Sequence, residues 1–338
     1  MIREAIAALV NERRDLTREE AAATMTEIMN GTATPSQLGS FLTAMRLKGE
    51  TIDELAGMAE VMRRFVLAVP AEGVVVDTCG TGGDNSGTFN VSTAAAFVVA
   101  GAGGRVAKHG NRAMSSHCGS ADVLEALGAR IELSPEQVSQ CIREVGFGFM
   151  FAPAFHPAMK HAAPTRREMG VRTAFNILGP LTNPAGARCQ LMGVAQAELA
   201  GKMAAVLQSL DCHHALVVHG AGGLDELSLS GPSQVYEVLD GTLREYAVSP
   251  EDVGLGEAPL AAVKGGTAEE NAEQLRDVLG GATGPLRDIV LLNAGAALVA
   301  ADLTPDLRTG VELAREAIDS GAALSRLNAF VEMTGSFA

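Results

Sequence analysis

The segment VVVDTCGTGGDNSGTFNVSTAAAFVVAGAGGRVAKHGNRAMSSHCGSAD, residues 74–122, indicates the architecture of the chain. In it, a short apolar run over Val74–Val76 precedes the glycine-rich sequence GTGGD, residues 80–84. A helical pattern over residues 92–102 and a second apolar run over residues 105–107 follow. This alternation predicts a βαβ unit with parallel strands.

The glycine-rich loop between strand and helix is the first candidate ligand site. In an open parallel sheet, ligands bind beyond the carboxyl ends of the strands, where a helix N-terminus presents free N–H groups. Residues without side chains let those amides close on phosphate oxygens. The loop is neither a P-loop, because no Gly-Lys-Ser/Thr follows, nor a GxGxxG fingerprint. By itself it supports an anion site and an ordinary strand-to-helix turn equally well.

Two polar segments follow the predicted strands. NVST, residues 90–93, stands at the start of the helical pattern, so its hydroxyls can cap the helix or reach an anion or metal. KHGNR, residues 108–112, follows the second strand and is itself followed by Ser115, Ser116 and Ser120. Basic residues interleaved with Ser, Asn and Gly are typical of an oxyanion cradle, although basic loop residues are also commonly solvated.

A cluster of arginines marks the segment FHPAMKHAAPTRREMGVRTAFNILGPLTNPAGA, residues 155–187. Arg166, Arg167 and Arg172 either grip a carboxylate, which a guanidinium can do bidentately, or lie on a helix surface. His156 precedes a proline, which favours a structural role for it.

Adjacent carboxylates, Asp225 and Glu226, lie in a glycine-flanked loop after the predicted strand His214–His219. Mg²⁺ takes few carboxylates and keeps water and phosphate oxygens as its other ligands, so such a pair suits it. As a bare dipeptide, Asp-Glu more often faces solvent. The residues alone therefore indicate a phosphorylated anionic ligand with Mg²⁺, and no more.

The chain divides into a small N-terminal all-helical domain and a larger α/β domain with a mainly parallel sheet. A capping box at Thr17 predicts a helix that ends near Gly31, and the Thr34-Pro35 pair predicts one that ends near Gly49. A second capping box at Thr51 predicts a helix that ends near Phe65. We place the small domain at residues 1–70, joined by about 164–184, and the α/β domain at 71–338. A further strand is predicted over residues 235–239, and the C-terminal third has a mostly helical pattern.

Composition narrows the functional classes. The 338 residues carry a formal net charge of −14, which argues against nucleic-acid binding. Five scattered cysteines without a CxxC pair argue against zinc and fit a reducing, cytoplasmic setting. The first residues lack the apolar core of a signal peptide, and the apolar run over residues 289–301 is too short to span a membrane. We expect a soluble cytoplasmic protein.

The motifs GTGGDxxxTFNVSTxxA, KHGNRxxSSxxGSADVLEALG, RREMGVRTxFNxLGPLxNPA and the GLDEL loop together resemble the anthranilate phosphoribosyltransferase family. They lie in the family's order, and the resemblance covers nearly the whole chain. It implies transfer of phosphoribosyl from 5-phosphoribosyl-1-diphosphate (PRPP) to the amino group of anthranilate in tryptophan biosynthesis, giving N-(5-phosphoribosyl)anthranilate and diphosphate. It also implies a fold similar to nucleoside phosphorylase-type phosphoribosyltransferases and a homodimer joined through the helical domains. His117, where many relatives carry Lys, is the visible departure.

The resemblance further implies the site residues. Lys108 and Arg112 would be catalytic, by offsetting charge on the departing diphosphate. Mg²⁺ would be held by Ser92, Asp225 and Glu226, and anthranilate by Gly80, Asn111 and Arg166, with Arg166 near its carboxylate. PRPP would be bound by Gly80, Gly83, Asp84, Thr88, Asn90, Val91, Ser92, Thr93, Lys108, His109, Gly110, Asn111, Arg112, Ala113, Met114, Ser115, Ser116 and Ser120.

Two other functions are compatible with the same fold. A nucleoside phosphorylase would need a different phosphate loop with lysine and serine, and no Asp-Glu pair. A non-catalytic nucleic-acid-binding relative would show a basic face and degraded glycine motifs. The acidic charge and the intact GTGGD of this chain favour the transferase over both.

Overall fold

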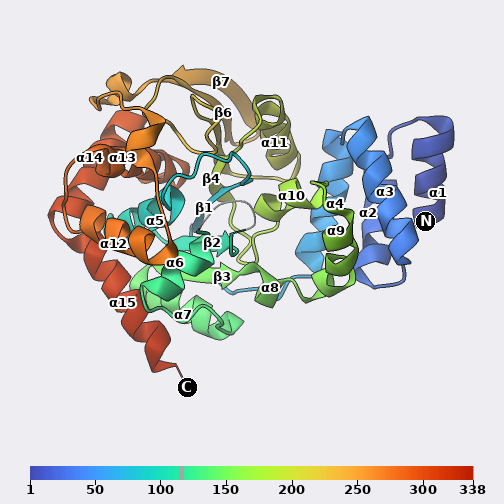
Figure 1. The fold of residues 1–338 in the computed structure, drawn as a ribbon, viewed down its shortest axis with the longest axis horizontal. Coiled ribbons are helices and arrows are strands. Elements are labelled where there is room, and N and C mark those ends of the chain that lie inside the picture. The colour runs from blue at the N-terminus through green and yellow to red at the C-terminus, as the bar shows by residue number, and fades with distance from the viewer. Residues whose placement is uncertain (114–117, 338) are drawn as a thin grey trace.

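The computed structural model describes residues 1–113 and 118–337. Figure 1 shows a bundle of helices at the N-terminal end beside a larger part built on a sheet. The bundle comprises α1 (Ile2–Ala7), η1 (Ala8–Glu12), α2 (Arg18–Met29), α3 (Pro35–Lys48) and α4 (Ile52–Arg64). The predicted combination of a helical unit with a mainly parallel α/β part is confirmed.

Within the described residues, seven strands form one sheet in the order β3-β2-β1-β4-β5-β6-β7. The first five strands pair in parallel, whereas β6 runs antiparallel to both β5 and β7. The bounds are β1 (Val76–Gly80), β2 (Val106–Gly110), β3 (Phe147–Phe151), β4 (Cys189–Gly193), β5 (His214–His219), β6 (Ser233–Leu239) and β7 (Thr242–Val248).

Four of these strands were expected from the sequence. The apolar runs at residues 214–219 and 235–239 correspond to β5 and β6, and the helical pattern at 92–102 is α5 (Val91–Gly101). The runs at 74–76 and 105–107 only overlap the starts of β1 and β2, which extend further toward the C-terminus. The strands β3, β4 and β7 were not expected. β7 is exposed along most of its length, which leaves little hydrophobic pattern to detect.

The helix ends in the bundle follow the capping residues. Thr17, Thr34 and Thr51 each accept a hydrogen bond from the backbone N–H three residues on, and the Glu or Gln there accepts one in return. Glu54, the reciprocal residue of the third box, is buried and also accepts hydrogen bonds from the Leu16 N–H and the Lys48 ammonium. This carboxylate therefore connects α4 to the chain before α2.

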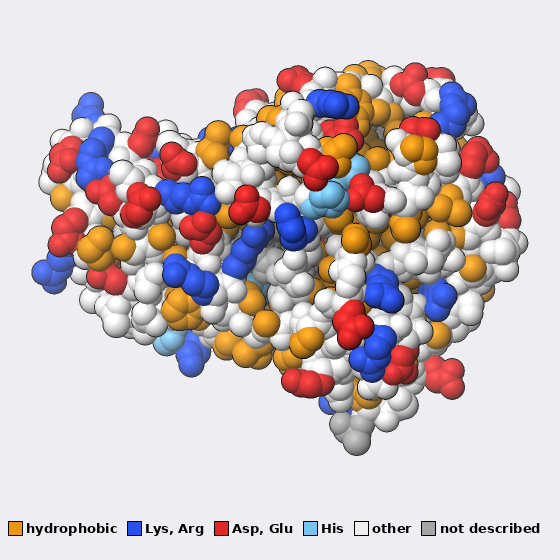
Figure 2. Space-filling model, turned by 180° about the vertical axis from the view of Figure 1, so that it is seen from behind, with side chains coloured by type: hydrophobic (Ala, Val, Ile, Leu, Met, Phe, Trp, Pro, Cys, Tyr) orange, Lys and Arg blue, Asp and Glu red, His pale blue; other side chains and the backbone are white. Residues whose placement is uncertain are grey.

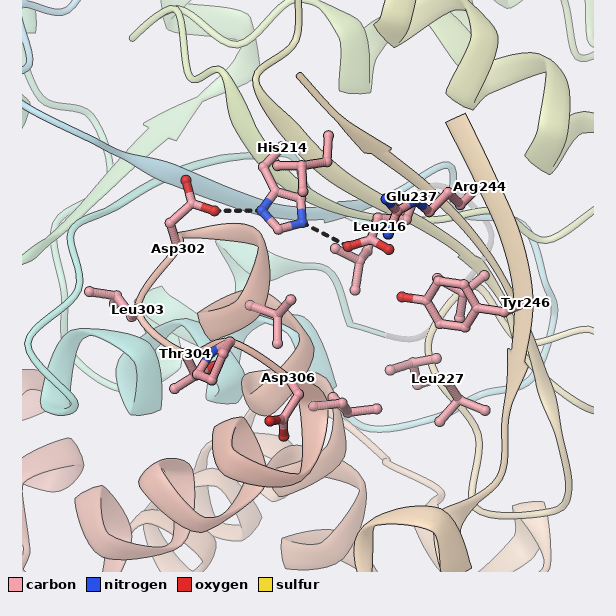
Figure 3. Close-up of a pocket in the computed structure, with 16 residues that line it drawn as sticks. His214, Leu216, Leu227, Glu237, Arg244, Tyr246, Asp302, Leu303, Thr304 and Asp306 are labelled. Carbon is pink, nitrogen blue, oxygen red and sulfur yellow. Dashed lines mark hydrogen bonds and ion pairs between the residues drawn. The ribbon is translucent and has the colours of Figure 1, made fainter. Parts of the chain in front are cut away.

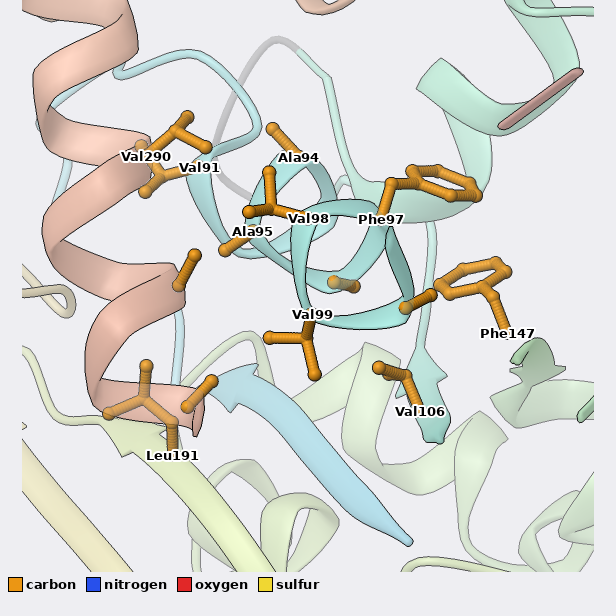
Figure 4. Close-up of a cluster of buried hydrophobic side chains, with 14 of the residues drawn as sticks. Val91, Ala94, Ala95, Phe97, Val98, Val99, Val106, Phe147, Leu191 and Val290 are labelled. Carbon is orange, nitrogen blue, oxygen red and sulfur yellow. The ribbon is translucent and has the colours of Figure 1, made fainter. Parts of the chain in front are cut away.

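Most helices of the larger part cover one face of the sheet around α5. Every α5 residue from Thr93 to Ala100 is buried, because α5 packs between the sheet and the C-terminal helices. Phe97 packs on Phe147 with ring centroids 4.2 Å apart (Figure 4). Phe330 contacts both rings. The other helices on this face are α6 (Ser120–Ala126), α7 (Pro135–Val145), α12 (Ala268–Leu279), α13 (Pro285–Ala300), α14 (Leu307–Asp319) and α15 (Ala322–Ser336).

The other face of the sheet packs against α11 (Ala197–Ser209) and, beyond it, the helical bundle. Alternate strand residues face the two cores: Leu191 belongs to the first and Met192 to the second. Short helices connect the layers: α8 (Ala152–Phe155), η2 (Pro157–His161), α9 (Ala163–Met169), α10 (Phe175–Leu178), η3 (Gly179–Leu181), η4 (Pro250–Val253) and η5 (Leu260–Val263).

The segment around residues 164–184 packs on the bundle. Helix α9 contacts α3 and α10 contacts α4, and Phe175 lies in the bundle's buried cluster. The helix breaks at Gly170, which has a φ of +64°. This packing supports the proposed division into residues 1–70 with 164–184 and residues 71–338.

No helix of the described residues is long and apolar enough to cross a bilayer. On the face seen in Figure 2, Lys and Arg side chains alternate with Asp and Glu side chains rather than gathering into a basic surface.

Phe97→Ala is expected to lower the free energy of unfolding by about 3–5 kcal/mol, because it empties a site packed on all sides. Urea denaturation followed by circular dichroism measures this. Val74→Ala, at a position 55% exposed, is the control and should change it by less than about 0.5 kcal/mol. A loss below about 1 kcal/mol in Phe97→Ala would show that the cluster is not the centre of the core.

Candidate active site

The glycine loop after β1, the start of α5 and the loop after β5 meet in one cleft at the carboxyl ends of the parallel strands. The cleft has a volume of about 170 Å³. Sequence segments far apart in the chain thus converge as the topology of an open parallel sheet predicts. Ten of the expected site residues line it: Gly80, Gly83, Asp84, Thr88, Asn90, Val91, Ser92, Ser120, Asp225 and Glu226.

The Asp225 loop lies directly on the ends of two strands. The Gly82 N–H donates a hydrogen bond to Asp225 Oδ2 over 2.8 Å. A Cβ at Gly80 would collide with that oxygen, and one at Gly193 would collide with the Asp225 carbonyl oxygen. Neither strand end therefore accommodates a side chain, which is the physical reason for glycine at both positions.

Three carboxyl groups gather in this cleft. Burial, reinforced by the charge of Asp84, raises the pKa of Asp225 to about 7, and burial, reinforced by Asp225, raises the pKa of Glu226 to about 8. Oδ2 of Asp84 is buried and accepts no hydrogen bond from the described residues. Acidic groups held this close without a cation favour protonation, so a bound cation would be strongly stabilised here.

The chemistry of these groups fits Mg²⁺, which takes oxygen ligands and completes its shell with water and phosphate. Among the described residues, no three His, Cys, Asp or Glu side chains are arranged as a ready metal cage. The cleft thus offers Asp225, Glu226 and the Ser92 hydroxyl while leaving other ligand positions to a phosphorylated substrate.

Lys108 lies beneath the cleft rather than in its wall. It is 1% exposed, and its ammonium donates to the Thr78 carbonyl oxygen and to Ser92 Oγ, the latter over 3.2 Å. Burial lowers its pKa, and the nearby acidic groups of Asp77 and Glu226 oppose that shift. In this structure Lys108 positions the Ser92 hydroxyl and the end of β1.

Asp77 lies beneath the cleft, as Lys108 does, and the sequence did not predict it as a site residue. Its carboxylate is fully buried and accepts hydrogen bonds from Asn183 Nδ2 over 2.8 Å and from the His109 N–H over 3.2 Å. Burial raises its pKa to about 6, against the opposing charge of Lys108. A lone Asp inside an apolar strand carries no recognisable motif, so only the tertiary structure reveals this network.

Asp122 bonds to backbone N–H groups on either side of residues 114–117. Its Oδ2 accepts hydrogen bonds from the Ala113 and Gly119 N–H groups, over 2.9 and 2.8 Å. The expected residues Met114, Ser115 and Ser116, and the variable His117, lie outside the described residues. Thr93 is buried, and its hydroxyl lies 3.2 Å from that of Ser120.

Arg112 is exposed, and its guanidinium pairs with Glu125 and with Asp122 of α6. These hydrogen bonds raise its pKa. Asn111 is exposed beside it and accepts a hydrogen bond from the Arg112 N–H. The positive charge of Arg112, which was expected to bind a phosphate, is thus paired with the carboxylates of Asp122 and Glu125 in this structure.

The arginines of the second motif lie in two different environments. Arg166 is mostly buried and stacks its guanidinium on the Phe175 ring at 4.9 Å, and burial lowers its pKa. Within the described residues it forms no ion pair. Arg172 instead donates to the Thr81 and Gly82 carbonyl oxygens over 3.2 and 3.1 Å. Arg172 was one of the three arginines considered for carboxylate binding, although the family resemblance did not include it in the site, and it ties the segment after α9 to the glycine loop.

His109 points away from the cleft. Its Nε2 lies 3.1 Å from Nε2 of His156, and burial lowers the pKa values of the two rings to about 3 and 4. Both rings are therefore neutral at physiological pH. Gly110 follows at the end of β2, where a Cβ would stand 2.8 Å from the Phe149 ring.

Two buried asparagines from the C-terminal helices support the cleft. Asn271 of α12 donates to Asn90 Oδ1 over 2.9 Å and accepts from the Gly266 N–H. Asn293 of α13 accepts from the Leu227 N–H over 2.9 Å and donates to the Leu227 carbonyl oxygen over 3.0 Å, directly after Glu226. Single asparagines in helices give no sequence signal, so these supports were missed.

Comparison with known proteins covers both parts of the chain. Residues 72–324 match the model of the α/β domain of a glycosyl transferase family, and residues 3–66 match the model of its helical bundle domain. Proteins named anthranilate phosphoribosyltransferase from Chloroflexus aggregans and Dehalococcoides mccartyi are 62% and 55% identical to this chain. The alignments cover 98% and 100% of this chain, and 98% and 99% of those proteins.

Solved structures of proteins with the same name have a similar fold. The crystal structure of anthranilate phosphoribosyltransferase from Thermus thermophilus superposes with a TM-score of 0.93 at 48% identity, covering 99% of both chains. The Saccharomyces cerevisiae enzyme in complex with PRPP and Mg superposes with a TM-score of 0.90 at 29% identity, covering 99% of this chain and 98% of that one. Another structure of the yeast enzyme is a complex with 4-fluoroanthranilate.

The raised pKa values predict a pH dependence of stability in the absence of divalent metal. The folded pKa values of Asp225 and Glu226, about 7 and 8, exceed the ordinary values of 3.8 and 4.5, so the folded state binds protons that the unfolded state has released. This stabilisation is fully present below the ordinary values and is lost as pH rises to the folded ones, by up to about 1.4 kcal/mol per pH unit for each group.

Urea denaturation in EDTA between about pH 5.5 and 8.5 tests this, in the window where the two carboxyl groups titrate. The free energy of unfolding of the wild type, relative to that of an Asp225→Asn/Glu226→Gln variant, should fall as the pH rises. Parallel pH profiles of the two proteins would show that these carboxyl groups titrate normally.

Proposed function

The chain belongs to the anthranilate phosphoribosyltransferase family, and we propose that it transfers the phosphoribosyl group of PRPP to the amino nitrogen of anthranilate, releasing diphosphate. The observation that carries the proposal is the 2.8 Å hydrogen bond from the Gly82 N–H to Asp225. It brings the glycine loop and the carboxylate pair to a single cleft, where both can act on one diphosphate group.

The PRPP site lies at the start of α5. The N-terminus of this helix carries a partial positive charge and free N–H groups, which favour phosphate oxygens. Thr88, Asn90 and Ser92 present polar side chains to the same cavity. The other PRPP residues implied by the family, including Met114, Ser115 and Ser116, remain part of this proposal.

Ser92, Asp225 and Glu226 are the proposed holders of Mg²⁺, for which the yeast relative's complex with PRPP and Mg provides support. When bound, this ion offsets the negative charge that develops on the diphosphate as the bond to the ribose breaks. Deprotonation of the two carboxyl groups accompanies such binding, because their pKa values are raised in its absence.

Lys108 and Arg112 contribute to leaving-group stabilisation in different ways. Lys108 fixes Ser92 Oγ from below and adds a buried positive charge next to Glu226, so it acts as a positioning residue. Arg112 meets a phosphate by exchanging its Glu125 and Asp122 partners for the ligand. Since the C1–diphosphate bond breaks through an oxocarbenium-like state, catalysis here depends on positioning and on charge stabilisation.

Anthranilate is held by Gly80, Asn111 and Arg166. Arg166 is the best supported of the three, because a mostly buried guanidinium without an ion-pair partner among the described residues calls for a ligand carboxylate. The amino nitrogen of anthranilate already carries a lone pair, so no strong general base is needed. The neutral His109–His156 pair is consistent with that requirement.

A homodimer joined through the helical domains and a cytoplasmic location complete the proposal. Leu47 of α3 is 83% exposed and Val10 is 55% exposed, which supports an apolar contact surface on the bundle. None of the five cysteines forms a disulfide among the described residues, which fits a reducing compartment.

Asp225→Asn is expected to lower kcat/KM for PRPP by about a hundredfold or more, because it removes a carboxylate that would hold Mg²⁺ and so weakens charge stabilisation of the departing diphosphate. The measurement is the fall of anthranilate fluorescence with PRPP and Mg²⁺. Asp277→Asn, at an exposed position on α12, is the matched control and should behave as wild type. Turnover of a nucleoside with inorganic phosphate by the wild type, without any loss of anthranilate fluorescence, would assign the cleft to a phosphorylase instead.

Arg166→Ala is expected to raise the KM for anthranilate by about ten- to a hundredfold, since a hydrogen bond to a charged group contributes about 1.5–3 kcal/mol. The KM for PRPP should change little. Arg167→Ala, at the exposed neighbouring position, serves as the control. An unchanged anthranilate KM would remove Arg166 from that pocket.

A further inference from the structure

A second and larger cavity lies at the antiparallel end of the sheet. Its volume is about 700 Å³, within the range of small-molecule sites, and it shares no lining residue with the catalytic cleft. It is bounded by β5, β6, β7 and the turn between α13 and α14 (Figure 3). It exists because α11 covers one face of β6 and β7, while the helices on the other face leave part of these strands uncovered.

The inner wall of this cavity is apolar. Alternate residues of β6 face it, so that Val235 and Leu239 line it together with Leu216 of β5. Leu227, the residue after Glu226, belongs to the same wall. Leu303, 43% exposed, lies on the turn that closes the other side.

Acidic groups dominate the polar part of the lining. His214 is held between Asp302, 2.7 Å from its Nδ1, and Glu237, 3.1 Å from its Nε2. Asp306 also faces the cavity and caps α14 through Oδ1, which accepts from the Thr309 N–H. Arg244, opposite Glu237 in the strand register, is exposed, as are Asp302 and Asp306, so solvent screens these three charges, whereas Glu237 is only 16% exposed.

A further group, besides the carboxylates, indicates a ligand. Tyr246 directs its hydroxyl into the cavity toward Glu237, and its ring adds a face of the kind that attracts cations (Figure 3).

We propose that this cavity is a second binding site, which takes a small, largely apolar molecule carrying an ammonium group. The apolar body lies against Val235, Leu239 and Leu216, and the ammonium faces Glu237 and Tyr246. An anion is disfavoured, because it would meet the carboxylates of Glu237, Asp302 and Asp306. A neutral analogue keeps only the apolar contacts and therefore binds more weakly.

Isothermal titration calorimetry with three probes of one shape tests the proposal on the full chain without PRPP or anthranilate. Phenethylamine is expected to bind, 2-phenylethanol to bind at least about tenfold more weakly, and 3-phenylpropanoate not to bind, following the charge of the cavity. Equal binding of the amine and the acid, or no binding of the amine, would overturn the proposal.

Two variants locate the bound amine. Glu237→Gln keeps the side-chain volume and should weaken phenethylamine at least about tenfold while leaving 2-phenylethanol unchanged. Leu239→Trp places a larger side chain in the apolar wall of the cavity and should abolish binding of both probes; its turnover of anthranilate should match the wild type, because Leu239 lies outside the catalytic cleft. Wild-type affinity for the amine in Leu239→Trp would place the amine elsewhere and refute the site.

Discussion

The close contact between the Asp225 loop and the ends of β1 and β4 is the constraint on which the catalytic cleft depends. Gly80 and Gly193 are paired in register, and a Cβ on either would collide with Asp225. Without those side chains, the Gly82 N–H can reach the Asp225 carboxylate over 2.8 Å. The glycine loop and the two acidic side chains then face one cleft. A single methyl group at either strand end would separate them.

Several buried ionisable side chains lie around this contact. The raised pKa values of Asp225 and Glu226 reflect desolvation, which a cation would offset. Lys108 supplies one buried positive charge from beneath, and Asp77 holds the same layer through Asn183 and the His109 N–H. The cleft is thus organised before any substrate arrives, as electrostatic stabilisation of a leaving group requires.

The C-terminal helices contribute more to the site than their polar content indicates. Asn271 and Asn293 reach from α12 and α13 to the residues that begin α5 and follow Glu226. The antiparallel end of the sheet has a different role, because the helices leave one side of it open and the second cavity forms there. Leu227 belongs to the wall of that cavity and to the backbone held by Asn293, so the two regions share one short segment.

Local patterns were sufficient for the helical bundle, the βαβ order and the glycine loop, because capping boxes, apolar runs and glycines act within a few residues. Motif order also identified the family, since such long motifs rarely occur together by chance. The sequence could not show that Lys108 lies beneath the cleft, that Arg172 holds the glycine loop, or that Asp77, Asn271 and Asn293 support it. Those contacts join residues far apart in the chain, and only the packing of sheet and helices decides which of them meet.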